Sequence, residues 1–228
     1  MRVVAVIPCH NEAYTIQGIV EETLHYVDSV VVADDNSVDG TELKAKTAGA
    51  KVVRNNSSRK GVGANTRRGL EAIDADIVVT LDGDGQHLAN EIPNVLAPIL
   101  HGDADLVIGS RFMSKNEMPR YRKFGNNVIT WLYNFGHSFK VSDTQSCFRA
   151  YNKKFLERIN IEERGFGFST EVLVKARSEG FKIVETPISC VYHDVYAHDS
   201  SMSPIKHGLN VALMTIKWRI KIELLRRR

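Results

Sequence analysis

Short apolar runs alternate with amphipathic stretches through the first half of the chain. The runs are rich in Val and Ile, a composition that favours buried strands, and they occupy Val3–Ile7, Ser29–Ala33, Lys51–Val53, Asp76–Leu81 and Asp105–Ile108. The stretches between them have apolar residues at helical spacing and predict helices over 16–27, 41–48, 64–73 and 90–101. This alternation predicts an α/β fold, with a mostly parallel central sheet and helices on both faces.

The second half of the chain contains fewer strand-like runs. Helices are expected over 124–139 and 169–178, a late strand over 182–185 and a polar loop over 192–204. No internal repeat or low-complexity linker interrupts the sequence. We therefore expect one domain over residues 1–204, with a nucleotide-binding part at about 1–112 and an acceptor part at about 113–204. Residues 205–228 are expected to form a basic amphipathic helix.

The stretch Val78–His87 combines a buried strand with a polar ending. Asp82, Asp84 and Gln86 follow the apolar residues and alternate with two glycines, which allow a tight turn or a close approach to a ligand. Three such oxygen-bearing side chains suit Mg²⁺ or Mn²⁺. A polar turn after a strand explains the same residues, so this stretch alone leaves both interpretations open.

Polar motifs also follow the first and second predicted strands. They are Pro8–Glu12 and Asp34–Thr41. In open parallel sheets, ligands bind outside the carboxyl ends of the strands. We therefore expect these two motifs and the Asp82–His87 motif to lie along one edge of the sheet, which favours a binding site over an isolated polar turn.

Composition narrows the class of protein. The 228 residues are 43% hydrophobic and 25% charged, with a net charge of +3, which is typical of a globular protein. Cys9, Cys147 and Cys190 are widely spaced and form no CxxC pair, so a reducing compartment is expected, with neither a disulfide framework nor a zinc site.

No run approaches the roughly 18 apolar residues of a membrane span. The basic residues near the end of the chain lack interleaved aromatics, which disfavours nucleic-acid binding.

Five motifs in order resemble the inverting family 2 glycosyltransferases. The Asp-x-Asp-x-Gln-His form is similar to that of dolichyl-phosphate mannose synthases and related polyprenyl-phosphate glycosyltransferases. The motifs are Pro8–Glu12, Asp34–Thr41, Asp82–His87, Gly109–Arg111 and Asp143–Arg149. The resemblance implies the GT-A fold, a nucleotide-binding α/β sandwich, and a glycosyltransferase activity.

The resemblance also implies roles for residues of the first half. Asp35 would contact the base or ribose of the nucleotide. Asp82, Asp84 and Gln86 would hold Mg²⁺ or Mn²⁺ and, through it, the donor diphosphate, with Asp84 counted among the catalytic residues. The nucleotide pocket would be lined by Pro8, His10, Glu12 and Asp82.

Three residues of the second half are implied in catalysis. Arg111 and Arg122 would bind phosphate oxygens, for which the planar guanidinium is suited. Asp143 is either a general base for a hydroxyl acceptor or a positioning group, and a phosphate acceptor would need no base. The chain departs from the family pattern at His10, Val62 and Cys147, where Tyr, Lys and Gly are usual.

The C-terminal segment has an apolar helical face and a basic character. The face comprises Ile205, Leu209, Ala212, Leu213, Ile216, Ile220 and Leu224. Such a helix lies on an anionic membrane surface, docks on a membrane partner, or packs on its own domain, and the sequence leaves these alternatives open.

The expected reaction is metal-dependent, inverting transfer of a hexosyl group from GDP-mannose or a UDP-sugar to a polyprenyl (dolichyl) phosphate. The expected location is the cytoplasmic face of a membrane, with the protein bound peripherally. The alternatives are the same donor chemistry with a hydroxyl acceptor on a glycan or small molecule, a nucleotidyltransferase, and a non-catalytic nucleotide-sugar-binding subunit.

Overall fold

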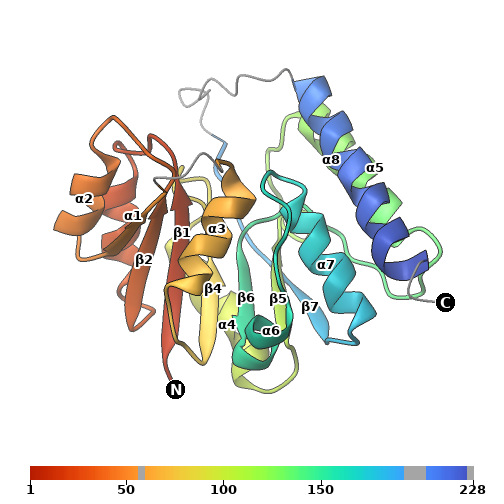
Figure 1. Ribbon diagram of the computed structural model, residues 1–228, viewed down its shortest axis with the longest axis horizontal. Coiled ribbons are helices and arrows are strands. Elements are labelled where there is room, and N and C mark those ends of the chain that lie inside the picture. Colours follow the sequence, from red (N-terminus) through yellow and green to blue (C-terminus); the bar gives the residue numbers. More distant parts are fainter. Residues whose placement is uncertain (56–59, 193–203, 225–228) are drawn as a thin grey trace.

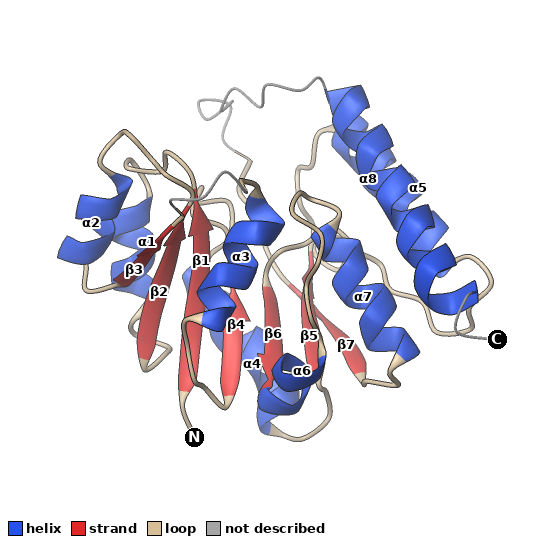
Figure 2. Cartoon of the chain, viewed as in Figure 1, coloured by secondary structure: helices blue, strands red, loops and turns tan. Residues whose placement is uncertain are grey.

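A computed structural model describes residues 1–55, 60–192 and 204–224 of the chain (Figure 1). Within these residues, seven strands form one sheet in the order β3-β2-β1-β4-β6-β5-β7 (Figure 2). The strands are β1 (Val3–Cys9), β2 (Ser29–Asp34), β3 (Lys51–Arg54), β4 (Ile77–Thr80), β5 (Leu106–Ser110), β6 (Arg149–Asn152) and β7 (Ile183–Pro187). The expected mostly parallel α/β sheet is confirmed.

Strand β6 is antiparallel and was not predicted from the sequence. It lies between β4 and β5, with Arg149 opposite Thr80 on one side and Ile108 on the other. The remaining pairs in the sheet are parallel. The four residues Arg-Ala-Tyr-Asn contain no Val or Ile, so their extended conformation reflects pairing with two neighbours rather than local preference.

Two hydrophobic clusters cover the two faces of the sheet. Alternate residues of β1 point to opposite faces, with Ala5 and Ile7 in one cluster and Val4 and Val6 in the other. The first cluster is closed by α1 (Ile16–Thr23), α2 (Thr41–Thr47), η1 (Ala89–Glu91) and α4 (Ile92–Leu100). The second cluster is closed by α3 (Val62–Glu71), α6 (Lys153–Arg158) and α7 (Phe168–Ser178).

Two further helices lie beside each other at the β7 end of the molecule (Figure 1). They are α5 (Arg120–Asn134) and α8 (Pro204–Arg219), and α8 continues as a π-helix, η3 (Ile220–Leu224). Helix α8 packs on α7 through Val211, Thr215 and Trp218, all buried. Among the described helices none is long and apolar enough to cross a membrane.

The predicted helix over 124–139 begins and ends earlier than expected. Helix α5 starts at Arg120 and stops at Asn134, because Phe135 has an extended ψ of 126° and Gly136 has a φ of +78°. Most of the polar loop predicted over 192–204 lies outside the described residues.

Candidate active site

The three polar motifs of the first half meet at the carboxyl ends of β1, β2 and β4, as expected. Thr15 Oγ1 donates to the Gly83 carbonyl oxygen at 2.6 Å, which joins the loop after β1 to the loop after β4. The Asn11 amide donates to Ser37 Oγ at 2.8 Å and so joins the loops after β1 and β2. Residues far apart in sequence therefore form one polar edge of the sheet.

Two glycines allow the Asp82–His87 loop to pack tightly on β1. A Cβ atom at Gly83 would lie 2.5 Å from Cys9 Sγ, closer than van der Waals contact allows. Gly85 has a φ of +78°, which a side chain disfavours. The spacing of the two carboxylates in this motif thus depends on glycines on either side of Asp84.

Three carboxyl groups crowd this edge. Burial, with Asp84, Asp82 and Asp39 nearby, raises the pKa of Glu12 to about 8. Burial also raises the pKa of Asp82 to about 6, although Arg111 and Arg149 act in the opposite direction. Glu12 and Asp82 are both easier to protonate than an isolated carboxyl, and the charges of Asp84 and Asp82 contribute to the shift of Glu12, so the cluster has an excess of negative charge that a cation would offset.

These carboxylates suit a divalent cation in chemistry, and they do not form a complete ligand set alone. Asp82 and Asp84 supply the hard oxygen atoms that Mg²⁺ and Mn²⁺ prefer. Among the described residues, no three His, Cys, Asp or Glu side chains are arranged to hold an ion. The donor set therefore fits an ion completed by water and substrate phosphates, which is the usual way proteins bind Mg²⁺.

His87 is hydrogen-bonded to the backbone of the Asp82–His87 motif. Its side chain is buried, and its Nδ1 accepts a hydrogen bond from the Asp82 amide at 3.3 Å. This bond places the ring proton on Nε2. Burial lowers the pKa of His87 to about 4, so the imidazole is neutral near pH 7. His87 belongs to the motif predicted from the sequence, but its role was not assigned there.

Arg111 and Asp143 form a buried ion pair. Arg111 Nε lies 2.7 Å from Asp143 Oδ2, and Nη2 lies 2.9 Å from Oδ1. The same carboxylate accepts bonds from the backbone amides of Arg111, Gln145 and Ser146. Burial alone would raise the pKa of Asp143, but Arg111 and these hydrogen bonds together hold it below its ordinary value.

Glu185 fixes the backbone at Asp143, and this role was not predicted from the sequence. Its carboxylate accepts hydrogen bonds from the Ser142 amide at 2.7 Å and the Asp143 amide at 3.0 Å. Asn116 acts similarly, donating to the carbonyl oxygens of Arg111 and Ile188. No sequence motif marks either residue, and the Glu185 contacts exist only once β7 pairs with β5.

The proposed nucleotide-binding residues lie at the ends of β1 and β2. Pro8 is within β1, and His10 Nδ1 lies 3.0 Å from the Asp35 carbonyl oxygen. The Asp35 carboxylate accepts bonds from Asn55 Nδ2 at 2.7 Å and from the Gly61 amide at 2.9 Å. These contacts connect Asp35 to both ends of the loop before α3.

Arg122 lies apart from the other candidate residues. It is exposed in the first turn of α5, and its charge adds to burial in lowering the pKa of His207 in α8. Within the described residues, no hydrogen bond or ion pair connects it to Asp82, Asp84 or Arg111. The structure thus brings together Glu12, Asp82 and Asp84, with Arg111 and Arg149 close to Asp82, and leaves Arg122 on a separate helix.

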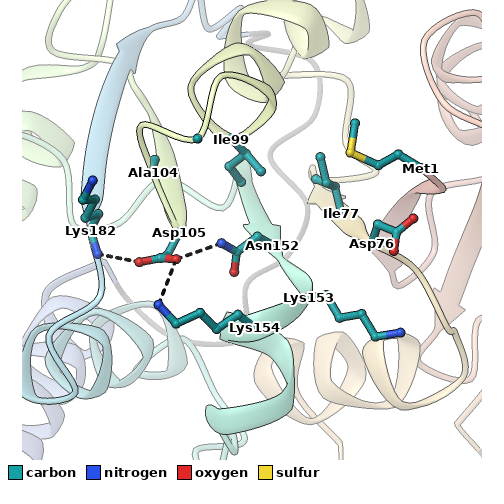
Figure 3. A pocket seen from close by; sticks show the side chains of 11 residues that line it. Met1, Asp76, Ile77, Ile99, Ala104, Asp105, Asn152, Lys153, Lys154 and Lys182 are labelled. Carbon is teal, nitrogen blue, oxygen red and sulfur yellow. Dashed lines mark hydrogen bonds and ion pairs between the residues drawn. The ribbon is translucent and has the colours of Figure 1, made fainter.

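A cavity of about 490 Å³ lies at the opposite edge of the sheet (Figure 3). It is lined by residues at the amino ends of β4, β5 and β7, including Ile77 and Lys182. Asp105 accepts hydrogen bonds there from Asn152 and from the Lys182 amide. This cavity is therefore separate from the carboxylate cluster.

Most of the chain matches a known protein family. Residues 4–159 match the family described as Glycosyl transferase family 2. The chain belongs to this family. It is a family 2 glycosyltransferase, and the resemblance seen in its motifs is confirmed.

Two curated relatives have names that state transfer of a sugar to a lipid phosphate, and a third is named only as a glycosyltransferase. The UDP-N-acetylglucosamine–dolichyl-phosphate N-acetylglucosaminyltransferase of Methanococcus voltae is 31% identical over 82% of this chain and 84% of its own length. The undecaprenyl-phosphate mannosyltransferase of Micrococcus luteus is 32% identical over 86% of each chain. Glycosyltransferase AglJ of Haloferax volcanii is 34% identical over 88% of this chain, which spans 66% of AglJ.

A solved structure confirms the GT-A fold. Glucosyl-3-phosphoglycerate synthase from Mycobacterium tuberculosis, in complex with Mn²⁺, UDP and phosphoglyceric acid, has a TM-score of 0.75 to this chain. The match covers 96% of this chain and 78% of the synthase at 20% sequence identity. At that identity the likeness establishes the fold and not the acceptor.

Proposed function

We propose that this glycosyltransferase transfers a hexosyl group from a nucleotide sugar, GDP-mannose or a UDP-sugar, to a polyprenyl phosphate with inversion at the anomeric carbon. The relatives that act on dolichyl and undecaprenyl phosphate support this acceptor class. The proposed location is the cytoplasmic face of a membrane, and the free thiols of Cys9, Cys147 and Cys190 are consistent with a reducing compartment.

The geometry of Asp143 is the observation that carries the acceptor assignment. A hydroxyl acceptor needs a base to remove its proton, whereas a phosphate is already ionised near neutral pH. Asp143 is fully buried, paired with Arg111 through both oxygens, and has a lowered pKa, all of which make it a poor base. We therefore assign Asp143 the role of positioning Arg111, which favours a phosphate acceptor over a hydroxyl acceptor.

We propose the remaining roles from the position of each group. Asp82, Asp84 and Gln86 would hold Mg²⁺ or Mn²⁺, which when bound would neutralise charge on the leaving diphosphate. The bonds to Asp143 use Nε and Nη2 of Arg111, so its Nη1 group is directed elsewhere and would bind a phosphate oxygen. Pro8, His10, Glu12 and Asp35 would surround the nucleotide. The acceptor oxygen would attack from the side opposite the diphosphate, which gives inversion.

The proposal is tested by following radiolabel from a panel of GDP- and UDP-sugars into polyprenyl phosphate with Mg²⁺ or Mn²⁺. We expect label in the organic extract from one donor, and its loss in Asp84→Ala. Label only in water-soluble products would contradict the lipid acceptor and favour a hydroxyl acceptor. Release of diphosphate instead of nucleoside diphosphate would indicate nucleotidyl transfer, and absence of turnover with every donor would favour a nucleotide-sugar-binding subunit.

A further inference from the structure

Helix α5 exposes a row of large apolar side chains. Tyr121, Phe124, Val128 and Trp131 recur every three or four residues along one side of the helix, and Phe135 follows directly after its last residue. Their exposed fractions run from 38% for Val128 to 72% for Phe124. The opposite side of α5 is buried through Ile129, Thr130 and Tyr133. A continuous row of exposed apolar side chains marks an interaction surface.

Helix α8 exposes a second row with the same spacing. Leu209, Leu213, Ile216 and Ile220 have exposed fractions from 40% to 61%. The two helices are in contact, and Arg219 Nη1 donates to the Leu132 carbonyl oxygen at 2.6 Å. Both also contact α7, since Tyr133 donates to the Leu173 carbonyl oxygen and Thr215 donates to Thr170 Oγ1. Each helix therefore buries one side toward α7 and leaves its apolar row outward.

Helices α5 and α8 themselves carry basic side chains and no acidic ones, although Lys217 of α8 and Lys221 just after it are paired with Glu163 and Glu162. Residues 118–142 contain four Lys or Arg and no Asp or Glu, and residues 204–222 contain the same numbers. The whole chain has 30 basic and 27 acidic residues, so the absence of acids from both helices is a local property. Arg120 and Lys123 are exposed at the start of α5, beside Tyr121 and Phe124. Apolar rows, aromatic rings and basic flanks together match a membrane surface with anionic lipids.

We propose that the outward rows of α5 and α8 form one docking surface for an anionic lipid bilayer. We call it the α5/α8 surface, comprising Tyr121, Phe124, Val128, Trp131, Phe135, Leu209, Leu213, Ile216 and Ile220. The inference rests on the proposed function, because a lipid-phosphate acceptor is the reason for this protein to bind a membrane. A second copy of the chain would have to place two such basic surfaces against each other, which makes it the poorer occupant.

The α5/α8 surface is connected to the candidate active site. Thr130 Oγ1 of α5 lies 2.9 Å from Thr144 Oγ1, in the residue that follows Asp143. Gln145 Nε2 donates to Thr170 Oγ1 at 3.1 Å, and Thr170 also receives the bond from Thr215 of α8. Both helices therefore support the segment that holds the Arg111–Asp143 pair, so a bilayer docked on their outer side would lie next to the proposed acceptor part.

The test is co-sedimentation with vesicles of phosphatidylcholine alone or with phosphatidylglycerol, lacking polyprenyl phosphate and nucleotide sugar. We expect binding to the anionic vesicles that weakens as salt is raised. Leu213→Glu and Phe124→Glu should each weaken binding by about tenfold or more, since each removes a large apolar contact. Arg120→Gln and Lys123→Gln should each weaken binding to anionic vesicles by about fivefold.

The matched control is Leu43→Glu. Leu43 is 70% exposed in α2, at the opposite end of the molecule from α5 and α8 (Figure 1), and its replacement should leave vesicle binding unchanged. Since the vesicles hold no acceptor or donor, binding and sugar transfer succeed or fail independently. Unfolding curves for each variant separate loss of binding from loss of fold.

A spectroscopic readout locates the contact. The chain has two tryptophans: Trp131 is 60% exposed within the surface and Trp218 is 1% exposed beneath α8. Anionic vesicles should shift the emission of the wild type to the blue, and Trp131→Phe should abolish the shift while keeping most of the binding. The proposal is overturned if the wild type does not bind anionic vesicles at low salt, or if Leu213→Glu binds them as tightly as Leu43→Glu. It is also overturned if the effect of Leu213→Glu is to dissociate a dimer.

Discussion

Arg111 and Asp143 hold each other in a two-pronged, largely buried ion pair. The Asp143 side chain is fully buried, that of Arg111 is 14% exposed, and their closest atoms are 2.7 Å apart. Removing one member of such a pair leaves the other as an uncompensated buried charge. Both the stability of the protein and the position of the guanidinium therefore depend on Asp143.

We expect Asp143→Asn to lower the free energy of unfolding by about 3 kcal/mol, because a buried Arg111 loses its counter-charge. The measurement is urea unfolding followed by circular dichroism. The control is Asp74→Asn, which removes the exposed partner of Lys153 at 3.2 Å and should cost less than about 1 kcal/mol. If Asp143 instead acts as a base, the variant would lose the acidic limb of the pH–rate profile at unchanged stability, contrary to this prediction.

The pH dependence of stability should reveal the carboxyl cluster. Glu12 has a pKa of about 8 in the folded protein against 4.5 for an ordinary glutamate, so the folded chain binds this proton more tightly than the unfolded chain. The stabilisation is complete below pH 4.5 and is lost as the pH rises toward 8. The Tm of the metal-free protein should therefore contain a component that falls over this range, and Glu12→Gln should reduce that fall.

Divalent cations should oppose the fall in Tm with rising pH that is expected for the metal-free protein. Asp82 has a pKa of about 6, so protons compete with the ion below that value, and Mn²⁺ should bind more tightly as the pH rises from 5 to 8. The increase in Tm on adding Mn²⁺ should grow over the same interval in the wild type and be small in Asp84→Ala. A Tm increase that is independent of pH would show that the ion binds away from these carboxylates.

The sequence predicted the sheet and the meeting of motifs because both depend on local patterns. Val and Ile runs mark β1, β2 and β4, and parallel pairing brings the residues after those strands together. Strand β6 was missed because Arg149–Asn152 lacks that pattern and is extended only by its two neighbours. The role of Glu185 was missed for the same reason, since its contacts join segments 43 and 42 residues apart.

The C-terminal helix shows a different limit of sequence periodicity. The apolar face seen in the sequence contains Leu209 and Leu213, which are the outward residues of α8. The face that packs on the domain includes Thr215 and Trp218. Because both side chains carry polar atoms, a pattern of purely apolar residues does not reveal this face. Trp218 is held there by the ammonium groups of Lys175 and Lys221, 4.7 Å and 4.4 Å from its ring. Packing on the domain, one of the alternatives left open by the sequence, therefore uses the side of the helix opposite the apolar face seen in the sequence.

His87 should control metal binding without touching the metal. Its Nδ1 accepts a hydrogen bond from the Asp82 amide at 3.3 Å, so losing this acceptor leaves a partly buried donor unsatisfied and should shift the Asp82 carboxylate. We expect His87→Phe to weaken Mn²⁺ binding by roughly 10- to 100-fold, measured by electron paramagnetic resonance. His87→Asn, whose side-chain oxygen replaces Nδ1, should restore most of the affinity. Exposed His101 provides the control, since His101→Phe should leave Mn²⁺ binding unchanged.

The contact between Gly83 and Cys9 provides a test by compensation. A methyl group at Gly83 would lie 2.5 Å from Cys9 Sγ but 3.6 Å from Cys9 Cβ, so only the sulfur atom obstructs it on this side. We expect Gly83→Ala to destabilise the protein by about 1–3 kcal/mol through overpacking and to weaken Mn²⁺ binding by displacing Asp82 and Asp84. Adding Cys9→Ala should recover both quantities, because it removes the sulfur and keeps Cβ. Additive losses in the double variant, measured by urea unfolding and Mn²⁺ titration against each single variant, would contradict the steric explanation.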